Sequence, residues 1–506
     1  MKFNIFNKKK NSKKNHQGAK AFKMTPKMEL YTSVVTSSLS NTFYEKEKDR
    51  LNRIIKLMKI VDPTFVAKLA VYTREQMYLR SIPLVLATEL SKIHKGDSLV
   101  KKTVSRVIGR ADEITEMLAY YQVANNRTGE KKLNRLSKQV QKGVATAFNK
   151  FDEYQFAKYN RKTAVSLKDA LFLTHPKAKD ENQQDLFNKI ANDTLSVPYT
   201  WEVELSGVGQ QAFRNERAKQ KATRLKWQEL IDSGRLGYMA MMRNLRNMLQ
   251  ADISNKHLQI VGDSLSDPQQ VRKSKQLPFR YLSAYRELEA LKDSRAGYLM
   301  ECLEEAVKTS IENIKGFDLN TKILLASDVS GSMYAPVSPR SKVQCYDIGL
   351  LLSMLMRNKS RNVITGIFGD TWEATTLPKS SILANTQKLR NMAGRVGYST
   401  NAYKVLQFLN KKKVKMDKVM FFTDLQMWDS TGKKNSLSKE WTRYKENVAP
   451  NAKLYLFDLV GYGQSPLSLK ENDVYLIAGW SDKVFEVMQA IEDGETALKM
   501  IENIKL

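Results

Sequence analysis

The feature that most constrains the fold of this chain is a change of sequence pattern near residue 320. From about residue 27 to 315, apolar residues recur at the 3.6-residue spacing of amphipathic helices, and β-branched alternation is rare. Beyond that point, short apolar runs such as 322–327 and 418–423 alternate with helical segments. Such alternation predicts a mostly parallel sheet with helices on both faces. The chain is therefore expected to be multidomain, with an all-α part followed by a Rossmann-like α/β part.

Three segments follow from this pattern. Residues 1–24 are rich in lysine and are expected to form a basic disordered arm. Residues 25–316 hold many helices joined by short loops, which pack most simply as a HEAT-like α-solenoid. That prediction depends on the number of helices, because no strict sequence period is present. Residues 317–506 are expected to form the α/β domain, with 371–376 as a short edge strand.

The charge of the chain is large and unevenly distributed. The 506 residues include 83 Lys and Arg against 53 Asp and Glu, a net charge of +30. Residues 1–316 carry +23 of this excess and residues 317–506 carry +7. A basic domain attracts phosphates, because neutralising them releases condensed counterions. The helical part is therefore predicted to bind nucleic acid.

Several classes of protein are excluded by composition. The two cysteines, Cys302 and Cys345, cannot build a disulfide framework or a thiolate zinc site. The four histidines are far apart in sequence, which argues against a zinc hydrolase. No run of about 18 apolar residues exists to span a membrane, and the first residues do not resemble a signal peptide. We expect a cytoplasmic protein with no membrane partner.

A D-x-S-x-S motif, formed by Asp328, Ser330 and Ser332, directly follows the first apolar strand. A second strand ends just before Asp424, and a loop that precedes a helix offers a hydroxyl from Thr400, with Ser399 as the alternative. The carboxyl ends of parallel strands line one edge of a sheet, so these oxygens should converge. They are hard ligands that suit Mg²⁺ or Mn²⁺.

The motif is also compatible with a structural role, and a metal site could in principle serve a nuclease. The two serines of the motif could merely cap a following turn or helix. A metal-dependent nuclease would need clustered carboxylates with an accessible base, and these sequences supply neither a general base nor a nucleophile. The chain is therefore expected not to be an enzyme.

The D-x-S-x-S motif resembles the metal-ion-dependent adhesion site of von Willebrand factor A domains. The resemblance implies that Ser330, Ser332 and Thr400 bind the cation directly, while Asp328 and Asp424 act through water. It also implies that the sixth position is left for an oxygen of a partner. A metal-dependent module that grips a partner's carboxylate is thus an alternative function, although it does not explain the charge of the helical half.

Five segments of the helical half resemble, in order, the TROVE module of the Ro autoantigen family. The resemblance covers about residues 25–495 and implies a HEAT-like ring, monomeric, that is closed by a von Willebrand A domain. The five segments are 79–90, 152–161, 168–177, 241–248 and 277–282.

This resemblance implies RNA partners. Family members bind small non-coding Y RNAs on the outer surface of the ring, and single-stranded 3′ ends of misfolded RNAs in its hole. Some bacterial members are tethered through the RNA to an exoribonuclease. The family's RNA-binding residues correspond here to Lys158, Lys162 and His175.

The same region can be interpreted without the family. Lys158, Arg161 and Lys162 lie near Tyr154, and basic residues beside aromatic rings suit phosphate contact and base stacking. The alternative is a solvated helix face with Tyr154 and Phe156 in the core, and His175 is equally compatible with a helix end satisfied locally.

Arg243 and Arg246 are spaced to share one helix face, where they would either line the hole or brace one helix against another.

Overall fold

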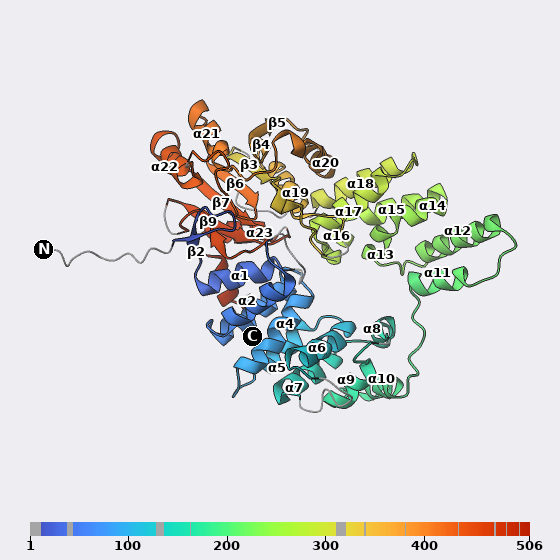
Figure 1. Cartoon of the computed structure of the whole chain (residues 1–506). Coiled ribbons are helices and arrows are strands. Elements are labelled where there is room, and N and C mark those ends of the chain that lie inside the picture. Colours follow the sequence, from blue (N-terminus) through green and yellow to red (C-terminus); the bar gives the residue numbers. More distant parts are fainter. Residues whose placement is uncertain are drawn as a thin grey trace. The chain divides into compact units, whose positions relative to one another are not determined.

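The protein forms two compact units in the computed structural model (Figure 1). One unit contains residues 1–60 and 314–498, and the other contains residues 61–313 and 499–506. The expected combination of a helical part with an α/β part is confirmed; closure into a ring stays a prediction. The structure describes residues 12–37, 44–127, 136–161, 163–309, 320–338, 341–379, 381–433, 435–469, 472–481, 483–494 and 496–506.

A six-stranded sheet forms the centre of the α/β unit, with the strand order β5-β4-β3-β6-β7-β9. Neighbouring strands are parallel except β4 and β5, which pair antiparallel, so the predicted short edge strand is confirmed. The strands are β3 (Lys322–Asp328), β4 (Asn362–Phe368), β5 (Trp372–Thr375), β6 (Lys418–Thr423), β7 (Lys453–Asp458) and β9 (Val474–Ala478).

Helices follow the strands as the sequence pattern predicts. Every residue of β6 is buried, and so are all but the first residue of β3, which explains why these strands are continuous apolar runs. The helical elements of this part are η1 (Gly331–Tyr334), α19 (Cys345–Arg357), α20 (Leu383–Met392), η2 (Ala393–Arg395), α21 (Tyr403–Lys412), α22 (Leu437–Asn447) and α23 (Val484–Glu492). The last helix, α24 (Ala497–Glu502), begins in this unit and ends in the other one.

The start of the chain differs from the predicted disordered arm. β1 (Ser12–Lys14) pairs with β2 (Lys20–Lys23), and β2 pairs with β8 (Gln464–Ser465), all antiparallel. The backbone ladder joins Phe22 to Ser465, and Ala21 and Met24 are buried. The expectation of disorder was wrong from Ser12 onward, because these hydrogen bonds and buried side chains order the segment. Residues 1–11 lie outside the described residues.

The next two helices, α1 (Pro26–Val35) and α2 (Glu47–Met58), also belong to the α/β unit. The hydroxyl of Tyr31 donates a 3.3 Å hydrogen bond to the carbonyl oxygen of Ala478. The buried guanidinium of Arg50 lies 3.0 Å from the Glu45 carboxylate and donates to the carbonyl oxygen of Val460. In space the division between the units therefore falls at residue 60, whereas the sequence pattern placed the whole of 25–316 in one domain.

The second unit is built from helices, each packed on near neighbours in the chain. α3 packs on α4 and α5, α5 on α7, α11 on α12, and α17 on α18. No helix within the described ranges is long and apolar enough to cross a membrane. The helices are α3 (Pro63–Glu75), α4 (Ser81–Ile93), α5 (Leu99–Val107), α6 (Ala111–Ala124), α7 (Lys138–Phe148), α8 (Glu153–Tyr159), α9 (Leu167–Thr174), α10 (Glu181–Ala191), α11 (Trp201–Gly209), α12 (Glu216–Asp232), α13 (Tyr238–Arg243), α14 (Leu245–Gln250), α15 (Asn255–Ser266), α16 (Pro268–Ser274), α17 (Pro278–Glu289) and α18 (Ala296–Thr309).

Candidate metal centre and RNA-binding surface

The D-x-S-x-S residues form a buried, tightly hydrogen-bonded turn where β3 ends. The backbone N–H of Ser330 donates to Oδ1 of Asp328 over 2.9 Å. The hydroxyls of Ser330 and Ser332 are 3.3 Å apart, and both residues are buried. The two serine oxygens and the carboxylate therefore face one small volume, as the motif predicts.

The other predicted ligands are buried as well. Asp424 follows β6, and its Oδ1 accepts from the backbone N–H of Gln426 over 3.0 Å, whereas its buried Oδ2 has no hydrogen-bond partner among the described residues. Thr400 is buried, while Ser399 is tied to Asp370, whose Oδ1 accepts from the Ser399 backbone N–H over 2.8 Å. This arrangement favours Thr400 over Ser399 as the third hydroxyl.

Burial alters the acidity of both carboxylates. Removal from water, and then the nearby charge of Asp424, raise the pKa of Asp328 to about 7. Burial also raises the pKa of Asp424. Two buried carboxylates, one with an unpaired oxygen, and two adjacent hydroxyls fit a small divalent cation, which would offset this cost. The described residues contain no cluster of three or more His, Cys, Asp or Glu side chains placed to hold a metal, so hydroxyls would have to complete the site.

Residues from the N-terminal part of the chain lie beside this centre. They were not among the predicted site residues. The phenol of Tyr44 hydrogen-bonds Ser332 and accepts from the side chain of Gln17. His16 stacks on Tyr44 with ring centroids 5.0 Å apart, and its backbone N–H donates to the side chain of Gln426 over 2.8 Å. No local sequence signal indicates the contacts of Tyr44 with Ser332 and of His16 with Gln426, because they join residues 288 and 410 positions apart.

The predicted basic and aromatic side chains come together on α8. The Lys158 ammonium lies 5.5 Å from the ring centroid of Tyr154 and 5.9 Å from that of Tyr159. Tyr154 is 44% exposed, whereas Phe156 is fully buried, so the interpretation that placed Tyr154 in the core was wrong. The Arg110 guanidinium stacks 4.4 Å from the Tyr159 ring centroid and adds a cation that the sequence analysis did not single out.

The remaining predicted contacts on this side are exposed. Arg161 lies two residues beyond the end of α8 and is solvent-exposed. His175 is exposed and ends α9 in the left-handed conformation, with φ of 47°. Its backbone, but not its ring, has a structural role as a helix cap. Lys162 lies outside the described residues.

Arg243 and Arg246 do not share a helix face, because α13 ends at Arg243 and α14 begins at Leu245. Arg246 forms a 2.6 Å ion pair with Glu287 of α17, which supports the bracing role. Arg243 lies near Arg280: burial, and then the charges of Arg243 and Arg80, lower the pKa of Arg280. Asn244 thus separates Arg246, which pairs with α17, from Arg243, which belongs to a cationic group with Arg280.

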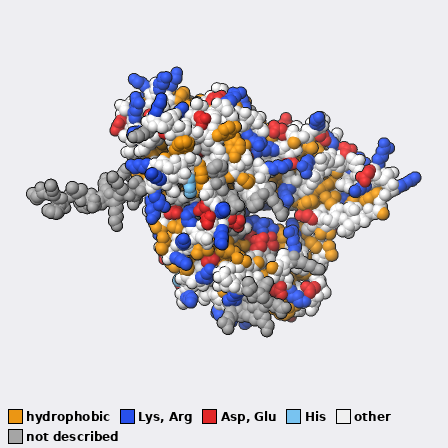
Figure 2. All heavy atoms as spheres, viewed as in Figure 1, with side chains coloured by type: hydrophobic (Ala, Val, Ile, Leu, Met, Phe, Trp, Pro, Cys, Tyr) orange, Lys and Arg blue, Asp and Glu red, His pale blue; other side chains and the backbone are white. Residues whose placement is uncertain are grey.

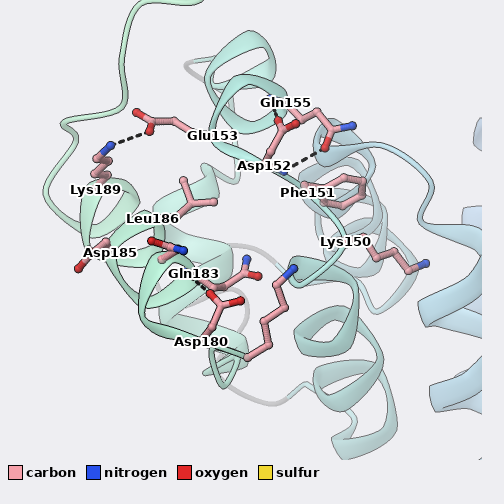
Figure 3. Close-up of a pocket in the computed structure, with 12 residues that line it drawn as sticks. Lys150, Phe151, Asp152, Glu153, Gln155, Asp180, Gln183, Asp185, Leu186 and Lys189 are labelled. Carbon is pink, nitrogen blue, oxygen red and sulfur yellow. Dashed lines mark hydrogen bonds and ion pairs between the residues drawn. The ribbon is translucent and has the colours of Figure 1, made fainter.

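Charge is otherwise spread over the molecule. On the face drawn in Figure 2, Lys and Arg side chains are scattered widely, with Asp and Glu among them. A cavity of about 560 Å³ between α8 and α10 is lined by both signs of charge, including the 2.6 Å pair of Lys189 and Glu153 (Figure 3). Its mixed lining favours neither an anion nor a cation, so the net charge alone does not select it as an RNA site.

Two family models and one solved structure together match nearly the whole chain. A TROVE domain model matches residues 8–202 and 194–315, and a Ro60 vWA domain model matches residues 322–491. The crystal structure of the Ro (RSR) protein of Deinococcus radiodurans covers 93% of this chain and 100% of its own, with a TM-score of 0.58 and 17% sequence identity. That likeness extends over both parts of the fold.

Curated relatives share part of the chain. Telomerase protein component 1 of Mus musculus is 24% identical over 336 residues, and the Rattus norvegicus protein of that name is 24% identical over 347 residues. Each match covers 52% of this chain, which spans only 13% of those proteins. The chain belongs to the family in which a TROVE domain is joined to a Ro60-type von Willebrand A domain.

Proposed function

We propose that this protein binds small structured RNAs on the surface that carries Lys158, Tyr154 and Tyr159, and that it acts as a binding protein rather than an enzyme. The observation that carries the proposal is the grouping of Lys158 with two tyrosine rings, one of them 44% exposed, in the more basic part of the chain. Ammonium groups suit phosphates and exposed rings suit unpaired bases.

We further propose which RNAs bind and which additional residues contact them. A Y-like non-coding RNA is the expected structured partner, with His175 and Arg161 at the edge of the same surface. Misfolded RNAs with single-stranded 3′ ends are the expected second class, for which Arg243 and its neighbour Arg280 are the candidate contacts. We also propose that the protein is a monomeric ring and that it acts in the cytoplasm. An exoribonuclease would be held to it through the bound RNA.

An RNA titration tests this function. A hairpin with a single-stranded 3′ tail is compared with the same hairpin with a blunt end, each at two salt concentrations. We expect both to bind, the tailed hairpin more tightly, and both affinities to fall as salt rises, because phosphate contacts release counterions. If neither RNA binds, the proposed function is wrong; if the two bind equally, the tail has no separate site.

A second function, metal-dependent binding of a protein partner, is favoured by one observation. The unpaired, buried Oδ2 of Asp424 lies at a centre with two adjacent serine hydroxyls. We infer that Mg²⁺ or Mn²⁺ would be held there by Ser330, Ser332 and Thr400, with Asp328 and Asp424 contributing through water. Calorimetric titration of the protein with Mg²⁺ and Mn²⁺ tests this, and the absence of saturable binding of either ion would contradict it.

A further inference from the structure

A second cavity, of about 280 Å³, lies next to the RNA-binding surface just described. Its walls come from α8, from the segment that leads into α11, and from the connection between α12 and α13. The volume is close to the lower end of the range for small-molecule pockets, about 300 Å³. It is therefore suited to one compact group rather than to a stretch of duplex.

Aromatic rings form much of the lining. Tyr154 of α8 contributes its exposed ring, and Tyr199 and Trp201 contribute partly buried rings from the opposite segment. Trp201 is held in place by stacking on Trp227, with ring centroids 6.1 Å apart and planes 18° apart. The cavity therefore offers ring faces on fixed supports, which is the arrangement that stacks on a flat, unsaturated ligand.

Each of two rings carries a cation at the edge of the cavity. The Lys158 ammonium lies 5.5 Å from the Tyr154 ring centroid, and the Arg235 guanidinium carbon lies 5.6 Å from the Tyr199 ring centroid. Among the residues that the structure describes, no carboxylate forms an ion pair with Lys158 or Arg235. The two cations are thus left to attract an anion.

The aromatic rings and the two cations together determine which class of ligand fits the cavity. Some aromatic pockets bind a cation such as a quaternary ammonium, but here Lys158 and Arg235 would repel a cationic ligand. A flat ring joined to a negative group satisfies both features, and an unpaired nucleotide has this chemistry. A paired base is excluded, because its faces are covered in the stack of a duplex.

We propose that this cavity receives one unpaired nucleotide of a bound RNA, with the base stacked on Tyr154 and Tyr199 and the flanking phosphates near Lys158 and Arg235. The inference rests on the proposed RNA-binding function and adds a specific site to it. Stacking is tolerant of base identity, so the pocket discriminates unpaired from paired nucleotides more than one base from another.

The test uses the full chain and the tailed hairpin, with each tail nucleotide replaced in turn by an abasic unit. We expect one replacement to weaken binding about tenfold, in line with the stacking of one base on an aromatic ring. At that position a 2-aminopurine base should lose fluorescence when the protein binds. Tyr154→Leu and Tyr199→Leu should reduce both effects, and Tyr154→Phe, which keeps the ring, should retain them.

Tyr398→Ala is the matched control, because Tyr398 is an exposed tyrosine of the other unit. A saturable titration with adenosine monophosphate, followed by Trp fluorescence, separates a free nucleotide from RNA as the source. If the hairpin binds but the abasic series and Tyr199→Leu leave affinity unchanged, the pocket is wrong and the RNA-binding function stands, because Tyr199 belongs to the pocket alone. If adenosine monophosphate alone binds, RNA is not the ligand of this pocket; if no RNA binds, the proposed function itself is wrong.

Discussion

The hydroxyl of Thr423, at the end of β6, donates a 2.6 Å hydrogen bond to Oδ2 of Asp328, at the end of β3. The other carboxylate oxygen of Asp328 accepts from the backbone N–H of Ser330. Both oxygens of this carboxylate therefore have a protein donor before any cation binds. This arrangement fits an aspartate that orients ligands and water rather than one that binds the cation directly.

Thr423→Val should weaken Mg²⁺ binding about tenfold, because loss of a supporting hydrogen bond typically costs 10- to 100-fold in metal affinity. The measurement is calorimetric titration with Mg²⁺ and Mn²⁺. Thr365→Val is the control, since Thr365 is also a buried threonine of the sheet and lies on β4, on the other side of β3. Equal affinities for the wild type and Thr423→Val would show that Thr423 does not support the site.

Thr400→Ala should abolish the stabilisation of the protein by Mg²⁺, and Ser399→Ala should preserve it. Thr400 is buried, whereas Ser399 is engaged with Asp370. A ligand that binds only the folded state at 100 times its Kd stabilises it by about 2.7 kcal/mol, which is readily seen as a rise in Tm. The opposite pattern in thermal unfolding with and without Mg²⁺ would assign the third hydroxyl to Ser399.

Lys158→Glu should weaken binding to tailed and blunt hairpins alike and should reduce the slope of log affinity against log salt by about 1. The reason is that a phosphate contact is lost and a repulsive charge is gained. Lys411→Glu, an exposed lysine at the end of α21 in the other unit, makes the same change of charge. An equal loss of affinity in both variants would indicate a general charge effect and not a contact at Lys158.

Arg243→Ala and Arg246→Ala should have different consequences. Arg246 is engaged in an ion pair with Glu287 on the surface, so its loss should cost about 0.5 kcal/mol of stability and leave RNA affinity unchanged. Arg243 lies in a cationic group, so its loss should reduce the preference for a tailed over a blunt hairpin. Urea unfolding and RNA titration of both variants measure the two effects, and a tail preference that survives Arg243→Ala would remove this residue from the RNA site.

Asp458→Asn should change how stability depends on pH. Burial, and then the charge of Asp424, raise the pKa of Asp458 from 3.8 to about 7, despite the backbone N–H donors of Val460 and Gly461. Between these values the folded protein keeps a proton that the unfolded chain has released. The contribution of Asp458 to the free energy of unfolding is therefore most favourable below about pH 4 and decreases as the pH rises to about 7.

The asparagine cannot ionise, so Asp458→Asn should become more stable relative to the wild type over this range, by about 4 kcal/mol at most. Urea unfolding at pH 4.5, 6 and 7.5 measures the difference, with the exposed Asp185→Asn as control. A difference that does not change with pH would mean that Asp458 is ionised throughout.

The α/β part could be predicted from the sequence because its signals are local. Continuous apolar runs identify β3 and β6, and the residues that follow them place Asp328 and Asp424 at the same sheet edge. The hydrogen bond from Thr423 to Asp328 is a consequence of that adjacency. The choice between Ser399 and Thr400 needed the structure, because adjacent hydroxyls in a loop carry no periodic signal.

The remaining features depend on contacts between distant residues, which no local pattern encodes. The pairing of Phe22 with Ser465 and the hydrogen bond between Tyr44 and Ser332 are of this kind. The break at Asn244 was missed for another reason: Met, Leu and Arg on both sides favour a helix, and tertiary packing overrides that preference.

The antiparallel pairing of β2 with β8 has a consequence for synthesis of the protein. Ser465 leaves the ribosome about 440 residues after Phe22, which at 5–20 residues per second is a wait of roughly 20–90 s. During that interval the nascent β1–β2 hairpin has an open edge, and the apolar faces of α1 and α2 lack the partners that bury them in the finished unit. Residues 61–313 of the helical unit, in contrast, pack mainly on near neighbours and can fold as they emerge, whereas residues 499–506 join that unit at the end of synthesis. The residues of β1 and β2 are thus made long before the strand that fixes their final place.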